Sequence, residues 1–286
     1  MPIKTYYSLI KPGVTYGNLL TVIAGFLLAS HDHINLVLFL AVTLGMGLVI
    51  GSACAFNNYF DQDIDRIMSR TKKRAIVAGS VSGRNALIFA SIIGVIGFAL
   101  LAIFANLLTV IVALIGFVDY IVFYGILSKR LSIHGTLVGS ISGAMPILAG
   151  YVAVTNSVDM GAILLFLILF FWQMPEFYSI SIYRRKEYAA AKIPVMSVVK
   201  GVQSTKVQIL IYMLAFTVVT LGLGLFGYTG YIYLLVMTLL CLRWVWIALQ
   251  GFTTKDDNKW AKSVFKFSLI VLVVFSILIS IDAWIP

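Results

Sequence analysis

The chain alternates between long runs of hydrophobic residues and short polar segments. Nine runs are near twenty residues long, which is the length an α-helix needs to cross a lipid bilayer. The pattern therefore predicts an all-α, polytopic membrane protein, with a solvated connection of mixed charge and an amphipathic tail near residues 253–266. The nine transmembrane helices are expected over residues 14–30, 36–59, 85–104, 108–127, 135–154, 160–183, 205–226, 228–249 and 264–285.

Composition supports this class and excludes others. Of the 286 residues, 61% are hydrophobic and only 11% are charged, whereas a soluble domain carries about 25% charged residues. Cys54 and Cys241 both lie in apolar runs and form no disulfide framework or haem-attachment motif. The first residues, MPIKTYYSLIKPG, show no separate signal peptide before the first run. This favours a prokaryotic plasma membrane.

The net charge of +10 is distributed unevenly along the chain. All 21 lysines and arginines stand before the first run or at residues 61–84, 128–134, 184–206 and 243–266, which cover alternate connections and the adjoining ends of the runs. The positive-inside rule then places the N-terminus and these connections in the cytoplasm, and the odd number of spans places the C-terminus outside. The charge is a topology signal and predicts no nucleic-acid partner. The opposite connections are short, at residues 31–33, 105–106, 155–159 and 228–230.

The densest charged stretch reads NNYFDQDIDRIMSRTKKR and runs from Asn57 to Arg74. Asn57, Asp61 and Asp65 are spaced by four, which places them on one face of a helix, about 6 Å apart. Two carboxylates at that distance repel by roughly 3 kcal/mol at an effective dielectric of about 20. A divalent cation relieves this repulsion, and Mg²⁺ commonly uses one or two carboxylates together with substrate phosphates.

Three arginines follow the acids at the same spacing. Arg66, Arg70 and Arg74 are expected to form a basic stripe beyond the acidic one, and guanidinium groups suit phosphate oxygens. Acids for a metal and arginines for phosphate together indicate a site for a metal-bound diphosphate. The alternative is a solvated loop whose charges only set the topology.

Polar residues inside the apolar runs allow two interpretations each. Asn18 faces the bundle interior or ends a helix at the interface. Asp119 lies near the middle of the fourth run, where inserting a carboxylate into the bilayer costs about 2.5–3.5 kcal/mol. It either contacts the substrate or makes a structural hydrogen bond. Lys129 binds phosphate or sets topology. Gly139 and Gly143 form a small-x-x-x-small pattern, which predicts close helix packing.

A second cluster of acids and bases ends the sixth run, in the sequence WQMPEFYSISIYRRKEY. It contains Glu176, Tyr183, Lys186 and Glu187, and it lies on the same side of the membrane as the first cluster. The connection that follows is long for a helical bundle, and such loops are often lids or binding segments. Residues 193–199 are expected to approach the membrane interface.

Taken together, the chain resembles the UbiA-type intramembrane prenyltransferases. The signature N-x-x-x-D-x-x-x-D of that superfamily matches Asn57, Asp61 and Asp65. A narrower resemblance to the haem O synthases (protohaem IX farnesyltransferases) extends over nearly the whole chain. It rests on five stretches in order: KPGVTYGNLL, NNYFDQDIDRIMSRTKKR, SKRLSIHGTLVGSISGAMP, WQMPEFYSISIYRRKEY and IPVMSVVKG.

The resemblance implies a single domain, 1–286, of nine helices around a central cavity, with catalytic cytoplasmic loops at about 57–84 and 183–204. It implies that Mg²⁺ is bound by Asn57, Asp61, Asp65 and Glu187, and the diphosphate by Asn57, Arg70, Arg74, Lys129 and Lys186. Asp61, Asp65, Arg70 and Lys186 are expected to be catalytic. Haem or prenyl contacts are expected from Asn18, Asp119, Tyr120, Tyr124, Trp172, Gln173, Glu176 and Tyr183.

Two positions depart from the pattern of the family. The second motif usually carries two aspartates spaced by four, but here Glu187 is followed by Ala191. This leaves one acid for a second metal. Glu176 stands where haem O synthases usually have histidine, in W-Q-M-P-H, which changes a contact that the histidine would make with haem.

The activity implied by the resemblance converts farnesyl diphosphate, haem b and water into haem O and pyrophosphate. It also implies residence in the cell inner membrane and handover of haem O to a haem A synthase or terminal oxidase. The alternatives are a UbiA-type enzyme that prenylates an aromatic quinone precursor, and a membrane transporter. The clustering of charge at one membrane face rather than at the midplane disfavours a transporter. The lack of paired histidines disfavours a haem-binding electron carrier.

Overall fold

The structure, a computed structural model, describes residues 3–31 and 33–284, so Asp32 in the predicted outer connection lies outside it. Within these ranges nine helices are long and apolar enough to cross a membrane, as the hydropathy pattern predicts. Eight are single α-helices: α2 (Pro12–Ser30), α3 (Leu36–Phe60), α5 (Gly83–Phe104), α8 (Gly135–Thr155), α9 (Met160–Tyr183), α12 (Gly201–Leu225), α13 (Tyr231–Gln250) and α14 (Asp257–Ile281). The ninth span joins α6 (Leu107–Val118), the π-helix η1 (Asp119–Ser128) and α7 (Lys129–Leu131), and the short 3₁₀ helix η2 (Asp282–Trp284) follows α14.

Several long helices begin at a polar side chain that caps the first turn. Asn35, Ser82, Asn106 and Asp159 each accept a hydrogen bond from a backbone N–H three residues later. The first turn of a helix leaves such N–H groups without partners, and a capping oxygen supplies one. These residues therefore fix where the apolar runs begin as helices.

The last helix begins earlier than the hydropathy pattern predicts, at Asp257, so the expected amphipathic tail of the preceding connection is the first part of α14. Asp256 caps α14 by accepting hydrogen bonds from the backbone N–H groups of Asn258 and Lys259, at 3.1 and 3.0 Å. Trp260 and Val264 are buried among exposed lysines in the first turns. This mixture lowers the mean hydropathy while preserving an amphipathic helix.

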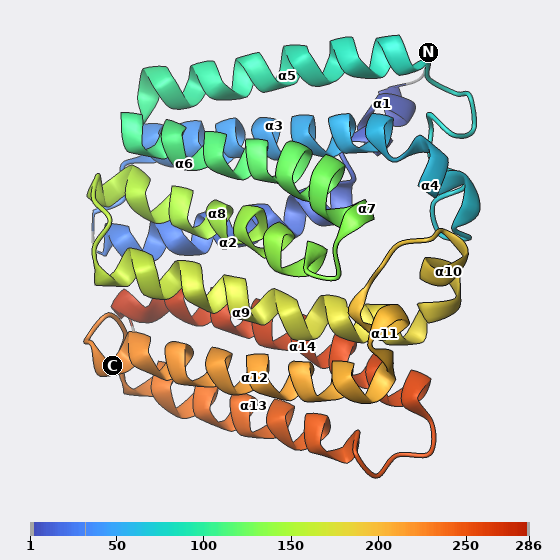
Figure 1. Cartoon of the computed structure of the whole chain (residues 1–286). Coiled ribbons are helices and arrows are strands. Elements are labelled where there is room, and N and C mark those ends of the chain that lie inside the picture. Colours follow the sequence, from blue (N-terminus) through green and yellow to red (C-terminus); the bar gives the residue numbers. More distant parts are fainter. Residues whose placement is uncertain (1–2, 32, 285–286) are drawn as a thin grey trace.

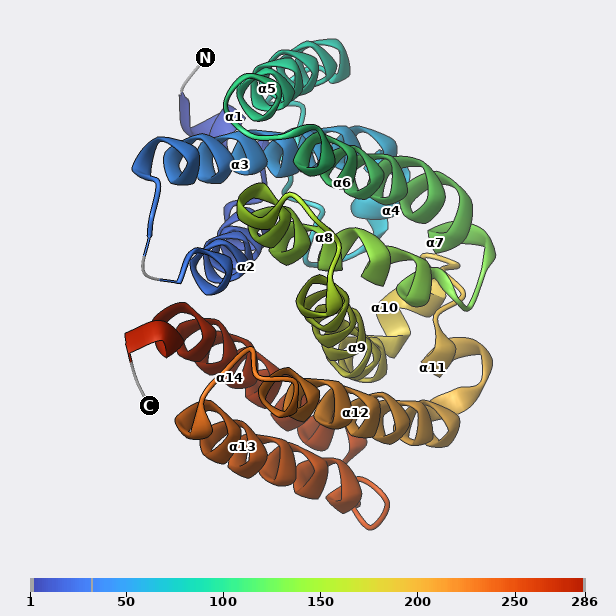
Figure 2. The same ribbon diagram turned by 90° about the vertical axis from the view of Figure 1, so that its left-hand side faces the viewer.

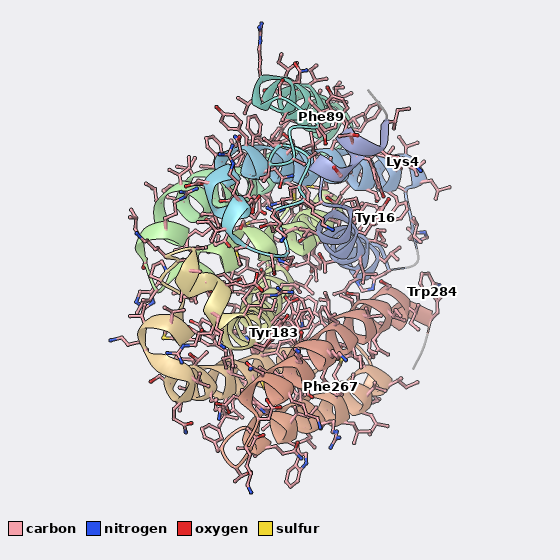
Figure 3. The ribbon with its side chains drawn as sticks, turned by 90° about the vertical axis from the view of Figure 1, so that its right-hand side faces the viewer. Lys4, Tyr16, Phe89, Tyr183, Phe267 and Trp284 are labelled. Carbon is pink, nitrogen blue, oxygen red and sulfur yellow. The ribbon has the colours of Figure 1, made fainter. Side chains whose placement is uncertain are left out.

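The helices pack in three groups. α2, α8 and α9 occupy the centre of the bundle, α3, α5 and α6 lie on one side, and α12, α13 and α14 lie on the other (Figures 1 and 2). The outer surfaces carry large exposed apolar side chains such as Leu107, Val218 and Leu225, which suit a lipid environment. Figure 3 shows the side chains projecting around the bundle.

The two central helices α2 and α8 meet at glycines. A Cβ atom on Gly25 would lie 2.2 Å from the carbonyl oxygen of Ile147, and one on Gly150 would lie 2.0 Å from that of Val22. The two backbones thus approach closely because neither glycine carries a side chain. This crossing fixes the spacing of two walls of the interior.

Short helices gather at one end of the bundle, here called the mouth end. They are α1 (Ile3–Leu9), α4 (Gln62–Ile67), α10 (Arg185–Ala190) and α11 (Met196–Val199) (Figure 1). The two charged loops predicted at 57–84 and 183–204 are therefore partly helical. Ile64, Met68 and Ile193 form a small buried cluster between them. Ile193 is buried in this cluster, whereas Val199 at the end of the same segment is exposed.

Candidate active site

A cavity of about 540 Å³ opens at the mouth end and extends between the central helices. Its polar lining near the mouth includes Asp61, Asp65 and Lys129. Deeper down, the lining is largely apolar and includes Met46 and Leu272. The shape therefore combines a charged entrance with a hydrophobic interior, which is the arrangement that an amphiphilic substrate requires.

The predicted acidic face persists although α3 ends at Phe60. The backbone N–H of Asp61 donates to Asn57 at 2.9 Å, and that of Asp65 donates to Asp61 at 2.8 Å. These helix-type hydrogen bonds carry the chain from α3 into α4, so the three side chains remain on one side. Asn57, Asp61 and Asp65 are all buried at the cavity wall.

Each of these three side chains is paired with a different basic residue. Lys129 Nζ lies 2.5 Å from Asp61 Oδ2, and Arg74 donates to Asp65 Oδ2 at 2.6 Å. Lys11 donates to the amide oxygen of Asn57. The three cations come from distant parts of the chain, which places positive charge around the whole acidic face.

Lys11 is a residue of this site that sequence reasoning missed as a contact. It precedes α2 and lines the cavity, and its Nζ lies 6.0 Å from the centroid of the Tyr120 ring. Burial lowers the pKa of Lys11 to about 8. Its partner Asn57 is 46 residues away, so no local pattern in the sequence indicates the contact.

The donor set fits a magnesium ion that shares its ligands with a substrate. The Oδ1 atom of Asp61 is buried and has no hydrogen-bond partner, and the Arg130 guanidinium lies 4.0 Å from it. An unpaired buried carboxylate oxygen is costly unless a ligand satisfies it. No group of three or more His, Cys, Asp and Glu residues in the described ranges is placed to hold a metal. Phosphate oxygens and water would therefore complete the shell, as is usual for Mg²⁺.

A bidentate ion pair joins the end of the fourth span to the loop of the acids. Arg130 contacts both carboxylate oxygens of Asp63, at 2.6 and 2.7 Å, and also donates to the backbone oxygen of Phe60. The Arg130 guanidinium lowers the pKa of Asp63 to about 2. Arg130 thereby holds its neighbour Lys129 close to Asp61, a function that the sequence alone did not assign to it.

The predicted basic stripe is not helical, because α4 ends at Ile67. Arg66 is exposed and lies outside the cavity lining, whereas Arg70 and Arg74 both line it. The turns after α4 redirect the chain and carry Arg74 back to Asp65. Two of the three arginines therefore reach the mouth. The turns after α4 bring them there, and not a helical spacing of four residues.

Most of the residues predicted to contact haem or prenyl groups line the cavity: Asn18, Tyr120, Tyr124, Trp172, Gln173 and Glu176. The rings of Tyr120 and Tyr124 stack with centroids 5.8 Å apart on the π-helix η1, an element that is rare and often occurs at functional sites. The predicted close packing at Gly139 and Gly143 makes room for two of these side chains. A Cβ at Gly139 would meet Tyr124, and one at Gly143 would meet Gln173.

Four predicted residues lie outside the described cavity lining. Asp119 is buried and accepts a hydrogen bond from the backbone N–H of Ser142, which is the structural alternative for this carboxylate. Tyr183 contacts Phe265, with ring centroids 6.2 Å apart. Lys186 is exposed, because it lies on the outer face of α10. The geometry of the described residues gives none of them a contact with the cavity.

Glu187, the fourth of these, connects the two mouth loops instead. Its carboxylate accepts hydrogen bonds from the backbone N–H and the hydroxyl of Ser69, at 3.1 and 3.0 Å. It also pairs with Arg184 at 2.9 Å. Burial raises its pKa, but Ser69 and Arg184 outweigh this and leave the pKa below the ordinary value. Glu187 therefore links the two mouth loops and is not placed to bind a metal.

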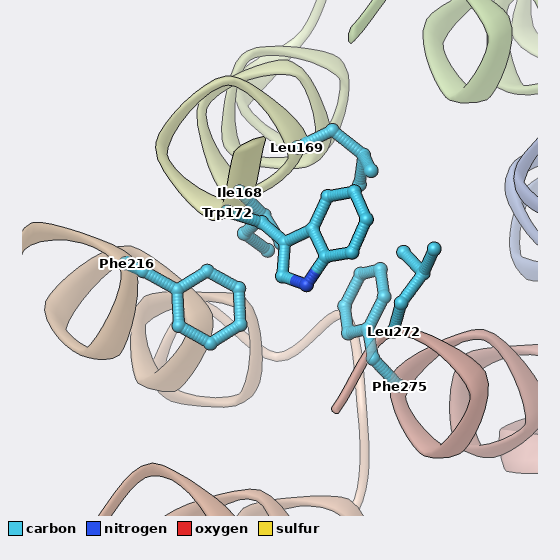
Figure 4. Close-up of a pocket in the computed structure, with 6 residues that line it drawn as sticks. All are labelled: Ile168, Leu169, Trp172, Phe216, Leu272 and Phe275. Carbon is cyan, nitrogen blue, oxygen red and sulfur yellow. The ribbon is translucent and has the colours of Figure 1, made fainter. Parts of the chain in front are cut away.

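Trp172 also borders a small apolar hollow beside the cavity. Figure 4 shows its indole ring beside Phe275 and Leu272, with Phe216 nearby. The hollow leaves no room for a water molecule, and the indole nitrogen donates to the backbone of Ser268 at 2.9 Å. This part of Trp172 is packed in the core, so only its cavity-facing side is available to a ligand.

The comparisons with known proteins agree with this geometry. The model of the UbiA prenyltransferase family matches residues 18–270, and the chain belongs to that family. Among curated relatives, "Protoheme IX farnesyltransferase" of Yersinia enterocolitica is 49% identical over 286 residues, covering 100% of this chain and 97% of the relative. The protein of the same name from Photorhabdus laumondii is 48% identical over 284 residues, covering 99% and 97%. The chain is thus similar over its full length to protohaem IX farnesyltransferases.

Solved structures confirm the fold at low sequence identity. A digeranylgeranylglyceryl phosphate synthase structure superposes with a TM-score of 0.82 at 18% identity, covering 98% of each chain. A UbiA homologue from Archaeoglobus fulgidus, described as bound to GPP and Mg²⁺, gives 0.73 at 14% identity and covers 96% of this chain and 99% of its own. Family membership favours the prenyltransferase prediction over the transporter alternative.

Proposed function

We propose that this protein transfers a farnesyl group from farnesyl diphosphate to a vinyl group of haem b, with addition of water, giving haem O and pyrophosphate. The observation that carries the proposal is the buried face of Asn57, Asp61 and Asp65 above a long apolar cavity, with one oxygen of Asp61 unpaired. The full-length similarity to proteins named protohaem IX farnesyltransferase supports the choice of substrates.

The acidic face is the proposed metal site. Asn57, Asp61 and Asp65 would hold Mg²⁺, whose positive charge, when bound, stabilises the leaving diphosphate. Family structures described with Mg²⁺ and GPP are consistent with such a site. Glu187 is left out of this ligand set because it is engaged with Ser69 and Arg184.

The basic residues around the acids are the proposed diphosphate ligands. Arg70, Arg74 and Lys129 line the same mouth of the cavity. As the bond between C1 and oxygen of the allylic diphosphate breaks, negative charge grows on the leaving group, and fixed cations stabilise it at the moment of reaction. In this structure Arg74 and Lys129 are bound to acids, so substrate binding exchanges their carboxylate partners for phosphate oxygens.

The apolar part of the cavity is the proposed site of carbon–carbon bond formation. Its walls accommodate the hydrocarbon tail and exclude bulk water from the allylic cation. The terminal vinyl carbon of haem bonds to C1, and the new cation at the carbon beside the porphyrin is captured by water. Tyr120, Tyr124 and Trp172 supply aromatic surface along this path.

The proposed location is a prokaryotic inner membrane, with the mouth end on the cytoplasmic side. Support comes from the position of every lysine and arginine, which stand before the first span, in alternate connections or in the adjoining parts of the spans. The mouth then faces the compartment in which water-soluble farnesyl diphosphate is expected. Haem O would pass on to a haem A synthase or a terminal oxidase in the same membrane.

The test is mass spectrometry of haems from cells that depend on this protein. Asp61→Ala and Asp65→Ala should each lower haem O formation at least 100-fold while the protein still inserts, because each removes a proposed metal ligand. Asp257→Asn is the matched control and should retain activity, because Asp257 is a half-buried acid at the same end that pairs with Lys206 outside the cavity. Retained haem O in both alanine variants, or prenylated aromatic rings in place of haem O, would contradict the proposal.

A further inference from the structure

The cavity is lined by three carboxyl groups in the described part of the chain. One of them has no role in the farnesyl transfer proposed for this protein. Asp61 and Asp65 stand at the mouth and are paired with Lys129 and Arg74. Glu176 lies on α9, seven residues before its end at Tyr183, which is about 10 Å deeper along a helix.

The side chain of Glu176 has no ion pair or hydrogen bond with any described residue; only its backbone oxygen is used, by the Ser179 hydroxyl. A carboxyl group in an apolar protein interior is costly to keep without a partner. Neighbours on the same helix do not supply one, since Gln173 donates its amide to the backbone oxygens of Ser140 and Leu169. The free carboxyl group therefore faces the reaction chamber.

The depth of Glu176 in the cavity matches the place where the second cation of the proposed reaction, on the haem carbon beside the porphyrin, must form. The diphosphate is held by residues at the mouth, so the carbon that reacts lies below them, toward the apolar part of the cavity. We propose that Glu176 is a further catalytic residue, whose carboxylate binds the water that captures the haem-side cation and accepts its proton. This inference rests on the proposed function and adds a role to it.

The vinyl carbon forms a bond to C1 of the farnesyl chain as the C1–O bond breaks and pyrophosphate leaves with the bonding pair. The carbon beside the porphyrin is left with a positive charge. The oxygen of water bonds to this carbon, and one proton of the water passes to the Glu176 carboxylate. The product carries a hydroxyl group, and no oxidant or reductant is needed.

The experiment compares Glu176→Gln with Glu176→Asp by mass spectrometry of the extracted haems. The glutamine variant keeps size and polarity but cannot accept the proton, so the cation should lose a proton from carbon instead and give an alkene, one water lighter than haem O. We expect the hydroxylated fraction of prenylated haem to fall at least tenfold in Glu176→Gln and to be largely restored in Glu176→Asp.

Asp119→Asn is the matched control, because it removes another buried carboxylate that lies outside the cavity lining. Its product should remain hydroxylated even if less protein accumulates. An unchanged hydroxylated fraction in Glu176→Gln would overturn the inference and leave the proposed function intact. Absence of any prenylated haem in both Glu176 variants, with the protein inserted normally, would also overturn it, since it would indicate a structural role. Absence of prenylated haem with the unmodified protein would refute the proposed function itself.

Discussion

At the scale of single residues, the site is a set of negative groups that are already neutralised. Asp61 and Asp65 each pair with a basic side chain, and the buried Oδ1 atom of Asp61 has no hydrogen-bond partner. Sequence spacing indicated the acids, because helical periodicity is local. It could not indicate the contact of Lys11 with Asn57 or that of Arg130 with Asp63, because these pairs are 46 and 67 residues apart.

Removing the cation beside Asp61 should make the protein more dependent on metal. Lys129→Met should destabilise the metal-free protein by roughly 3 kcal/mol, because loss of one partner leaves a buried charge unpaired. Added Mg²⁺ should recover more stability in this variant than in the unmodified protein, since the carboxylate gains a cation. The measurement is thermal unfolding in detergent across a Mg²⁺ titration.

Lys206→Met provides the comparison for that experiment. Lys206 is buried and pairs with Asp257 at 2.6 Å, away from the cavity. This variant should lose stability without any added response to Mg²⁺. An equal gain in stability from Mg²⁺ in the two variants would show that the metal does not bind in the space that the Lys129 ammonium leaves beside Asp61.

At the scale of elements, hydropathy predicted the number and approximate position of the spans, because a lipid environment demands long apolar runs. It failed where helices are amphipathic or short. The start of α14 mixes lysines with the buried Trp260, and α4, α10 and α11 are too short to produce a clear period. The arginine stripe was misplaced for the same reason, since α4 ends after Ile67.

The glycine crossing of α2 and α8 gives a prediction at this scale. Gly150→Ala would put a Cβ atom 2.0 Å from the backbone oxygen of Val22, and overpacking of this kind costs about 1–3 kcal/mol. The variant should unfold at a lower temperature and lose activity, because the two helices form walls of the cavity. Gly222→Ala in α12 meets only Leu164 at 3.5 Å. It should be neutral or slightly stabilising, and equal effects of the two substitutions would contradict the argument.

At the scale of the whole molecule, charge and fold are aligned. The short helices gather at one end of the bundle (Figure 1). The polar entrance of the cavity and the basic loops of the sequence lie at the same end. The whole-chain pattern therefore predicted which end carries the polar entrance of the cavity. It could not predict the depth of the cavity, which depends on how α2, α8, α9 and α14 are spaced in three dimensions.

The orientation can be tested with single cysteine labels in intact cells. Cys54 and Cys241 are both buried, so background labelling should be low. Ser157→Cys, in the exposed connection after α8, should react with a membrane-impermeant maleimide added from outside. Lys192→Cys, exposed at the mouth end, should react only after the membrane is opened. The reverse pattern would place the mouth on the outer side.

The π-helix η1 has a consequence for the alignment of the basic residues that follow it. Its backbone hydrogen bonds reach one residue further than in an α-helix, up to the bond from Lys129 N–H to the carbonyl of Tyr124. Each residue of an ordinary helix advances the side chain by about 100° around the helix axis. The wider π-helix has a different advance, so it changes the direction in which every side chain after Ser128 points. Removing one residue from this segment would turn Lys129 away from Asp61 without changing any charge. The protein would keep all the charged side chains of the site but would lose the ion pair between these two.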